Sequence, residues 1–399
     1  MKREIQKAFD ALLSACKNPI SELDKALLQR AVETIYNNQI LPQNGETLGW
    51  GTRRSFAPSL PRYVGHWNWD SAFYAMALLK WDPALAREQA DILFSAQHEN
   101  GCLPNLVLTN GVAITNRSQP PVWFWAYREI DEAAPDNDAL CNAYAVLTKY
   151  ERFWTTRRCV NGLFRYDTDE DKNPYFVKFE SGWDTSPRWD TYTPDALWPI
   201  DLNCYMVLAY QSLSYMAQRL GKQDDYAHWS ALENDLVQRI NSKLWHEELL
   251  LYSDTIIETG LPTCILTPAS FLPLFVGIAD ERQAECMARI AGDPQKFYPL
   301  MPSVAYDAPQ YASADYFRGP TWLNISYMAL IGLERYGYTR LADAFRNRLL
   351  TMCAEEKRGL FEYYDSRSGE GRGACGYGWT AAFLIKLILE KNDHAPYKK

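Results

Sequence analysis

Apolar residues recur along most of this chain at the three- and four-residue spacing of amphipathic helices. Between positions 200 and 245 two such runs follow one another, and Gly221 stands between them where the first helix would end. The first run contains Met206, Ala209, Leu213, Met216 and Leu220, and the second contains Trp229, Leu232, Leu236 and Ile240. The pattern predicts two consecutive helices joined by a short turn.

The same arrangement returns near the C-terminus. Its two runs are defined by Trp322, Ile325 and Leu333 and by Phe345, Leu349 and Met352. The segment 377–391 is apolar nearly all round, which predicts a helix buried on every side. At the other end, Ser21 follows Pro19 and suits an N-cap, so we expect the first helix to begin there. In all, roughly a dozen helical segments arranged in pairs are expected.

A short motif, a glycine followed by apolar and aromatic residues, recurs after alternate helical segments. Segments 161–167 and 358–365 are nearly the same, and 100–105 is a degenerate copy. Regular self-similarity of this kind indicates repeated helix pairs. Six pairs closing on themselves give an all-α (α/α)6 barrel of six helical hairpins, with short strands in the loops and the loops gathered at one end. Strands are too sparse for a parallel α/β sheet, and helices are too many for a four-helix bundle. No linker divides the chain, so one domain over residues 1–399 is expected.

Composition and charge argue against several classes of function. The formal net charge is −8, and no cluster of Lys and Arg suits nucleic acid or an anionic membrane. No apolar run reaches 18 residues, and the N-terminal residues lack the features of a signal peptide. The nine cysteines are scattered without a CxxC pair, and the five histidines lack HxxxH or HExxH spacing. We therefore expect a cytoplasmic protein without a metal or other cofactor, and its oligomeric state stays open.

The candidate chemistry centres on segment 180–190, which gathers two tryptophans, an arginine and three acids. Glycine, serine and proline within it predict a loop. Trp183, Trp189 and Arg188 beside Asp184 suit a sugar site, where flat apolar faces meet the ring and charged groups meet hydroxyls and protons. A buried Asp beside Trp also acquires a raised pKa and becomes an acid at neutral pH. The alternative is a buried loop with an Asp184–Arg188 ion pair.

This segment resembles the acid-bearing loop of inverting α-glycosidases that share an (α/α)6 barrel, namely glycoside hydrolase family 63 and the trehalases. Four further segments resemble the same group, in consistent order from about Tyr63 to Trp379. Segment 65–71 is similar to the W-x-W-D-S entry of an inner helix, and 116–121 to the R-S-Q-P-P motif of trehalases. Segment 316–322 is similar to the Y-W-R-G-P-x-W motif of family 63, with Phe317 in place of Trp, and 361–379 is similar to the base-bearing region.

The resemblance implies hydrolysis with inversion. One carboxyl group protonates the leaving oxygen, and a second, about 6.5–9.5 Å away, activates a water. Asp184 falls on the family's general acid, because it occupies the Asp of the E-S-G-x-D-x-S motif. Glu362 falls on the E-Y-Y position of the base, although a Glu in a short strand could equally alternate outward to solvent. Asp365 and Glu370 are nearby alternatives for the base.

The resemblance also implies a sugar-binding cleft. Asp70 either holds sugar hydroxyls, as the family's Asp does, or caps a helix. Tyr63 and Trp67 would form a wall on which the ring stacks. The expected substrate-binding residues are Tyr63, Trp67, Trp69, Asp70, Arg117, Gln119, Trp183, Arg188, Tyr316, Phe317, Arg318, Trp322 and Trp379.

Within family 63 the chain is most similar to the compact bacterial hydrolases of mannosylglycerate and glucosylglycerate. We therefore expect an inverting α-glycosidase of a small soluble α-glucoside or α-mannoside, without a nucleic-acid or membrane partner. Trehalase-like hydrolysis of an α-linked disaccharide is the alternative that segment 116–121 suggests. A sugar epimerase or a non-catalytic sugar-binding protein is a further alternative, against which the dispersed histidines and the two motif carboxylates argue. Glucose or mannose as glycone, and the identity of the aglycone, stay open.

Overall fold

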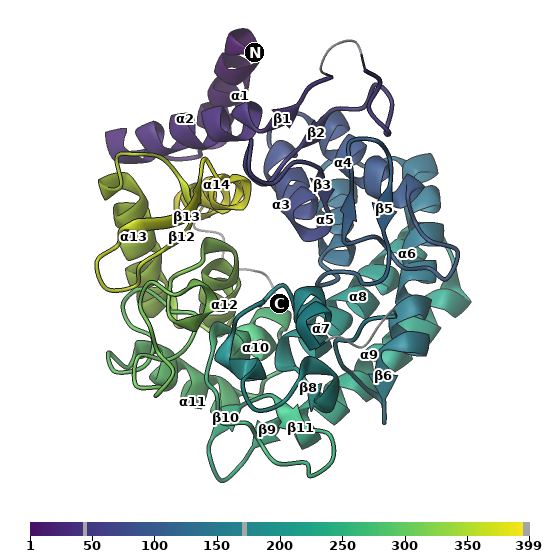
Figure 1. Ribbon diagram of the computed structural model, residues 1–399, viewed down its shortest axis with the longest axis vertical. Helices are drawn as coiled ribbons and strands as arrows, with labels where there is room; N and C mark the ends of the chain where they lie inside the picture. The colour runs from purple at the N-terminus through teal and green to yellow at the C-terminus, as the bar shows by residue number, and fades with distance from the viewer. Residues whose placement is uncertain (43–45, 170–173, 394–399) are drawn as a thin grey trace.

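Two layers of helices form a ring in the computed structural model, which describes residues 1–42, 46–169 and 174–393 (Figure 1). Each helix of the inner layer contacts the next, and the last contacts the first. In ring order these inner helices are α3 (Asn68–Leu78), α5 (Trp123–Ala133), α8 (Ile200–Arg219), α10 (Leu272–Val276), α12 (Leu323–Arg335) and α14 (Gly378–Asp393). The expectation of a mainly helical, barrel-like fold is thus confirmed.

The second layer lies outside this ring. Its helices are α2 (Glu22–Asn37), α4 (Pro83–Ser95), α6 (Asn137–Arg157), α9 (Gln223–Lys243), α11 (Glu281–Gly292) and α13 (Thr339–Glu355). Helix α2 packs on α14, α4 on α3 and α9 on α8, so each of these pairs places one helix inside and one outside. Two further helices, α1 (Lys2–Ala15) and α7 (Pro174–Ser181), stand apart from this alternation.

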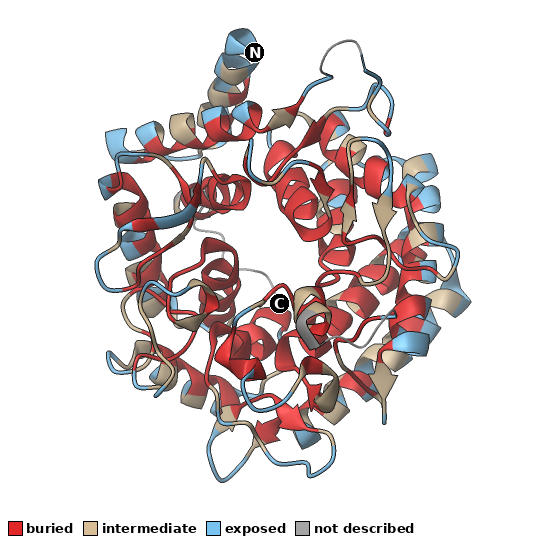
Figure 2. Cartoon of the chain, viewed as in Figure 1, coloured by how far each residue is buried: buried red, intermediate tan, exposed pale blue. Residues whose placement is uncertain are grey.

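The burial of the helices follows the hydrophobic pattern of the sequence. Every residue of α3 is buried, and so is α12 from Leu323 to Leu333, as the continuous apolar character of these inner helices requires (Figure 2). In the outer helix α9 the buried residues are Trp229, Leu236 and Ile240, which lie on one face. The predicted helices at 206–220, 229–240, 345–352 and 377–391 are confirmed as α8, α9, α13 and α14.

The observed helix ends agree in part with the ends predicted from the sequence. The Ser21 hydroxyl accepts a hydrogen bond from the Asp24 backbone N–H, so Ser21 is the N-cap of α2 as expected. The expectation that the first helix begins there is wrong, because the amphipathic helix α1 precedes it and buries Ala8 and Leu12. Gly221 adopts φ 70° directly after α8, which satisfies the predicted helix end.

Short antiparallel strand pairs lie in the loops and make no continuous sheet in the described part of the chain. The strands are β1 (Gln39–Ile40) with β2 (Ser55–Phe56); β3 (His66–Trp67), β4 (Leu106–Val107) and β5 (Ala113–Ile114); β6 (Cys159–Val160) with β7 (Leu163–Phe164); β8 (Leu197–Trp198) with β11 (Thr255–Ile256); β9 (Trp245–His246) with β10 (Leu251–Tyr252); and β12 (Phe361–Tyr364) with β13 (Gly371–Cys375). The repeated motifs at 161–167 and 358–365 thus contain strands, whereas 100–105 does not.

Aromatic side chains fill the interior of the ring of helices. Trp69 of α3 contacts Phe73, Phe73 contacts Phe383 of α14, and Phe383 contacts Tyr327 of α12, with centroid distances of 5.7, 4.8 and 5.0 Å. Tyr327 then stacks on Trp125 of α5 across the barrel. These contacts join α3, α14, α12 and α5 through aromatic side chains packed inside the ring of helices. No helix among the described residues is long and apolar enough to span a membrane.

Candidate active site

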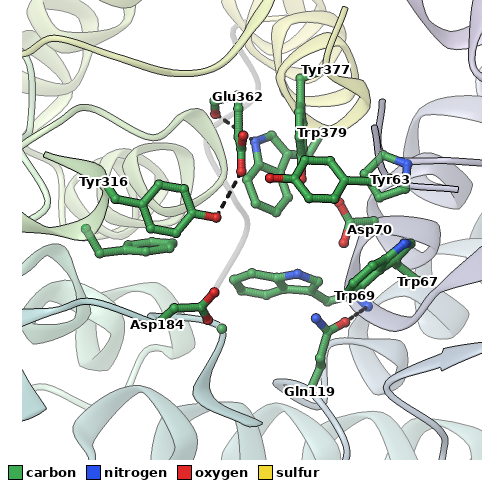
Figure 3. Close-up of a pocket in the computed structure, with 13 residues that line it drawn as sticks. Tyr63, Trp67, Trp69, Asp70, Gln119, Asp184, Tyr316, Glu362, Tyr377 and Trp379 are labelled. Atoms are coloured by element: carbon green, nitrogen blue, oxygen red, sulfur yellow. Dashed lines mark hydrogen bonds between the residues drawn. The ribbon is translucent and has the colours of Figure 1, made fainter. Parts of the chain in front are cut away.

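A pocket opens near the start of the inner helices α3, α12 and α14, between loops from distant parts of the chain (Figure 3). Its empty volume, with the open mouth included, is about 550 Å³. The lining residues are Pro58, Tyr63, Trp67, Trp69, Asp70, Gln119, Gly182, Asp184, Tyr316, Phe317, Glu362, Tyr377 and Trp379. Ten of them were expected from the sequence, and they come together from positions 63 to 379.

Glu362 reaches the pocket because of an irregularity in its strand. The register of β12 and β13 shifts between Phe361 and Tyr363, so Gly373 and Ala374 together face Glu362. Gly373 adopts φ 74°, and a Cβ there would lie 2.6 Å from Glu362 Oε2. The bulge breaks the outward alternation that a regular strand would impose, and Glu362 is only 2% exposed.

Two donors hold the Glu362 carboxylate. The Tyr316 hydroxyl donates to Oε1 at 3.0 Å, and the Ala374 backbone N–H donates to Oε2 at 3.0 Å. Burial raises the pKa of Glu362, and these two hydrogen bonds oppose the rise because they favour the charged form. A group held in this way keeps a defined direction toward the cavity.

The two alternative carboxyl groups do not line the pocket. Asp365 closes the turn after β12 and accepts hydrogen bonds from the Arg367 and Ser368 backbone N–H groups. Burial acts to raise the pKa of Asp365, but these donors outweigh it and hold the pKa below its usual value. Glu370 is exposed and pairs with Arg372. Of the three acids considered for the base, Glu362 is the one that faces the cavity.

Asp184 lies in the connection that follows α7. This segment is not wholly a loop, since Ser181 still belongs to α7 and residues 187–189 form a 3-10 turn. Gly182 adopts φ 69° at the end of the helix, and a Cβ there would lie 2.6 Å from the Trp69 ring. A glycine is therefore needed to bring the backbone against Trp69 and to direct Asp184 into the pocket.

The environment of Asp184 favours its protonated form. Burial and, next, the negative charge of Glu362 raise the pKa of Asp184 to about 7, against a smaller opposing effect of the Arg117 charge. Two carboxyl groups from distant segments thus influence each other across one cavity (Figure 3). An acid that keeps its proton near neutral pH can donate it during a reaction.

Asp70 is the third carboxyl group of the pocket. It stands in the first turn of α3, but Trp67 occupies the N-cap position, so the expectation of a simple helix cap does not describe it. Its Oδ1 is buried and lacks a hydrogen-bond partner among the described residues. Burial and the charge of Glu362 raise the pKa of Asp70. The Gln119 side chain instead satisfies the helix start, accepting from the Trp69 backbone N–H at 3.1 Å.

Aromatic rings form the walls. Tyr63 meets Trp67 and Tyr377 edge to face, with centroids 6.1 and 6.0 Å apart. Burial raises the pKa of Tyr63 to about 12, and the exposed Arg62 guanidinium lies 5.3 Å from its ring centroid at the rim. Such walls suit the apolar faces of a sugar ring, while the carboxyl groups suit its hydroxyls.

Pro58, Gly182 and Tyr377 line the pocket but were not among the expected residues. Tyr377 could have been predicted from the sequence as a lining residue, because it directly precedes the inner helix that also carries Trp379. Pro58 and Gly182 contribute backbone shape and no reactive side chain, so their residue types carry no chemical signal.

Five residues expected to bind substrate do not line the pocket, contrary to the sequence-based expectation. Four of them are Trp183, Arg188, Arg318 and Trp322. Trp183 and Trp322 are completely buried behind the wall, each in contact with the Phe317 ring. Arg188 is buried between Asp201 and Asp254, so the Asp184–Arg188 ion pair that the sequence left as an alternative does not form. Arg318 pairs with Asp190. These side chains support the pocket from outside.

Arg117 is the fifth residue that lies outside the lining. Its guanidinium stands 5.3 and 5.6 Å from the ring centroids of Phe176 and Phe179, and it donates to the Asn116 side chain. Its charge still acts on the pocket, because it is one of the influences on the pKa of Asp184. Among the described residues, no group of three or more His, Cys, Asp or Glu side chains is arranged to hold a metal ion.

The chain as a whole has counterparts among known proteins. The family model described as mannosylglycerate hydrolase MGH1-like glycoside hydrolase domain matches residues 63–380. The chain belongs to this family. It is therefore a glycoside hydrolase, and the sequence resemblance to family 63 is confirmed.

Among relatives, the mannosylglycerate hydrolase of Rubrobacter radiotolerans is 25% identical, covering 83% of this chain and 92% of the relative. The glucosylglycerate hydrolase of Mycolicibacterium hassiacum is also 25% identical, covering 85% and 94%. Among solved structures, the GH63 mannosylglycerate hydrolase from Thermus thermophilus in complex with Tris and D-glycerate has a TM-score of 0.77 and 24% identity, covering 90% of this chain and 99% of that one. Neutral trehalase Nth1 from Saccharomyces cerevisiae has a TM-score of 0.68 and 19% identity, covering 88% and 76%.

Proposed function

We propose that this protein is an inverting α-glycosidase in which Asp184 is the general acid and Glu362 is the general base. The observation that carries the proposal is the pair of carboxyl groups facing one cavity in different environments. The pKa of Asp184 rises to about 7. Burial raises the pKa of Glu362 as well, but Glu362 accepts two hydrogen bonds that favour its charged form and oppose the rise. Environments that separate two carboxyl groups in this way support different roles for them.

The reaction follows from these roles. Glu362 removes a proton from a water as the water oxygen bonds to the anomeric carbon from one face of the ring. The bond from that carbon to the glycosidic oxygen breaks, and Asp184 gives its proton to the departing oxygen. Asp184 ends as a carboxylate and Glu362 as an acid, and exchange with solvent restores both. Attack opposite to the leaving group inverts the anomeric centre.

Other lining residues would hold the sugar. The unpartnered Asp70 Oδ1 is an acceptor for sugar hydroxyl groups, and Gln119 presents its amide nitrogen while its oxygen is engaged by α3. Tyr63, Trp67 and Trp379 supply ring faces and edges. The substrate class we infer is a small α-glucoside or α-mannoside, such as glucosylglycerate or mannosylglycerate, in line with the names of the relatives.

We also infer that the ring of paired helices is a complete (α/α)6 barrel and that the chain acts as one domain. The unbroken sequence of contacts around the inner helices supports this count. Both carboxyl groups lie on loops at one end of the ring, where such a barrel gathers its connections.

The decisive measurement is proton NMR of the first product released from α-linked glucosides and mannosides. The β-anomer should appear first and then mutarotate. First release of the α-anomer would mean retention and would remove Glu362 from the role of water-activating base. Glu362→Gln should abolish hydrolysis while far-UV circular dichroism stays unchanged, since the substitution conserves volume and removes only the basic charge. Epimerised sugar, or binding without turnover, would point to the two non-hydrolytic alternatives.

Trehalase-like activity is the second candidate, favoured by the R-S-Q-P-P motif within segment 116–121. A substrate panel containing trehalose, glucosylglycerate, mannosylglycerate and the corresponding glycerol glycosides separates the two candidates. Turnover of trehalose well above that of the glycerate and glycerol glycosides would favour the trehalase assignment. The roles of Asp184 and Glu362 would stand in either case.

A further inference from the structure

The acid loop, residues 183–190, carries Asp184, and a backbone hydrogen bond within this residue acts to lower the pKa of its carboxyl group. Among the described residues, none donates a side-chain hydrogen bond to the Asp184 carboxyl group, and no cation lies within ion-pair distance of it. The direction of this carboxyl group therefore depends on how firmly the loop backbone is held. Two arginines that were expected to bind substrate hold it instead.

Arg188 holds the loop from inside the protein. Its Nε and Nη2 donate to the two oxygens of Asp254 at 2.7 and 2.8 Å, and Nη1 and Nη2 donate to those of Asp201 at 3.0 and 2.7 Å. The Arg188 side chain is 0% exposed. Asp201 is in the first turn of α8, and Asp254 also accepts from the Ile200 backbone N–H that begins this helix. The loop is thus tied by two bidentate, charge-assisted contacts to the first turn of α8 and to Asp254, which itself caps the start of that helix.

The same guanidinium reaches back to the residue before the acid. It lies 5.1 Å from the Trp183 ring centroid and 4.5 Å from that of Trp189. The Trp189 indole N–H donates to the Trp183 carbonyl at 2.9 Å, and the Trp183 N–H donates to Ser181 Oγ at 3.0 Å. Both polar groups of the Trp183 backbone are therefore fixed, directly before Asp184.

Arg318 holds the loop from the other side. Its Nη1 and Nη2 donate to the two oxygens of Asp190 at 2.8 and 2.7 Å, and Nη1 also donates to the Thr185 carbonyl at 3.3 Å. The Phe317 backbone N–H donates to Thr185 Oγ1 at 3.3 Å. Because Arg318 is 24% exposed, it can be changed with little risk to folding.

We propose that Arg188 and Arg318 are positioning residues that fix the acid loop so that Asp184 points at the glycosidic oxygen. The proposal rests on the proposed role of Asp184 as general acid. Arg188 fixes Trp183 and Arg318 fixes Thr185, the two neighbours of Asp184 in the chain. Loosening either contact leaves the sugar-binding residues of the pocket in place and displaces the proton donor.

The choice of leaving group distinguishes a displaced proton donor from general damage to the pocket. Glycerate is a poor leaving group and needs a proton, whereas fluoride departs from the anomeric carbon without one. The test measures Arg188→Lys and Arg318→Gln against glucosylglycerate and mannosylglycerate, and against α-glucosyl and α-mannosyl fluoride. A displacement near 1 Å costs on the order of 10²-fold in rate. We expect kcat for the glycerate substrates to fall about 100-fold in Arg188→Lys and about 10-fold in Arg318→Gln.

KM should change little, and hydrolysis of the fluorides should stay within about threefold of the unaltered protein. Two matched controls have the same kinds of contact elsewhere. Arg346→Lys changes a buried arginine that pairs with Glu334 and Asp343 in the α12–α13 pair, and Arg239→Gln changes an exposed arginine bidentate to Asp235. Neither control should show a dependence on the leaving group.

Equal losses on glycerate substrates and fluorides would overturn the proposal, because they would indicate general damage to the pocket. If Arg188→Lys does not fold, as judged by circular dichroism, Arg318→Gln decides alone. The same measurements on Asp184→Asn distinguish a failure of the positioning role from a failure of the proposed function. A leaving-group dependence in Asp184→Asn but in neither arginine variant rejects the positioning role. If Asp184→Asn itself shows no leaving-group dependence, Asp184 is not the acid.

Discussion

The raised pKa of Asp184 should have a cost in stability that a single substitution removes. An ordinary aspartate has a pKa of 3.8, and in the folded protein the pKa of Asp184 is about 7. Below pH 3.8 the carboxyl group is protonated in both the folded and the unfolded chain. Between these two values the unfolded chain has released its proton while the folded protein keeps it, so the native state loses stability as the pH rises.

The size of the effect follows from the two pKa values. Each unit of difference corresponds to about 1.4 kcal/mol, and more than half of the loss falls between about pH 5 and pH 8. Over that range Asp184→Asn should gain about 2–3 kcal/mol in unfolding free energy relative to the unaltered protein, because Asn does not ionise. With unfolding entropy near 2.1 cal/mol/K per residue, a chain of 399 residues converts this into roughly 3 °C in melting temperature.

The assay is thermal unfolding of both proteins at about pH 5, 6, 7 and 8, followed by circular dichroism. The difference in melting temperature should widen as the pH rises and level off once the pH exceeds the folded pKa, while hydrolysis of glycerate substrates is lost. Glu258→Gln, which removes an exposed carboxyl group outside the pocket, is the control and should show no such widening. A constant difference between Asp184→Asn and the unaltered protein over the whole range would refute a raised pKa at this position.

Three further outcomes are expected. Tyr316→Phe removes a donor that favours charged Glu362, so the pKa of Glu362 should rise further and the acidic limb of the kcat/KM profile should move to higher pH; an unmoved limb would contradict the contact. Gly182→Ala places a Cβ 2.6 Å from the Trp69 ring at φ 69° and should lower both melting temperature and kcat, as calorimetry and kinetics can check. Exhaustive dialysis against a chelator should leave activity unchanged, and a loss that one divalent ion restores would show that the two-carboxylate scheme is incomplete.

Local pattern was enough to predict several of the helices, and the resemblance to known motifs predicted most of the residues that line the pocket. Burial of one face, or of all faces, requires apolar residues at helical spacing, and this rule was sufficient to predict α8, α9, α13 and α14. The order of motifs from Tyr63 to Trp379 was sufficient to gather ten of the thirteen lining residues. Motifs preserve residue type and spacing, and reactive groups need both.

What each polar side chain faces depends on the folded chain. Arg188 stands four residues after Asp184, yet its partners are Asp201 and Asp254, 13 and 66 residues away. Glu362 faces the cavity because Gly373 permits a bulge in the partner strand. The sequence of β12 alone does not predict that bulge. A buried charge is tolerated where a partner compensates the loss of water. Because that partner lies elsewhere in the chain, the sequence around a charged residue identifies the charge, and tertiary packing determines what the charge contacts.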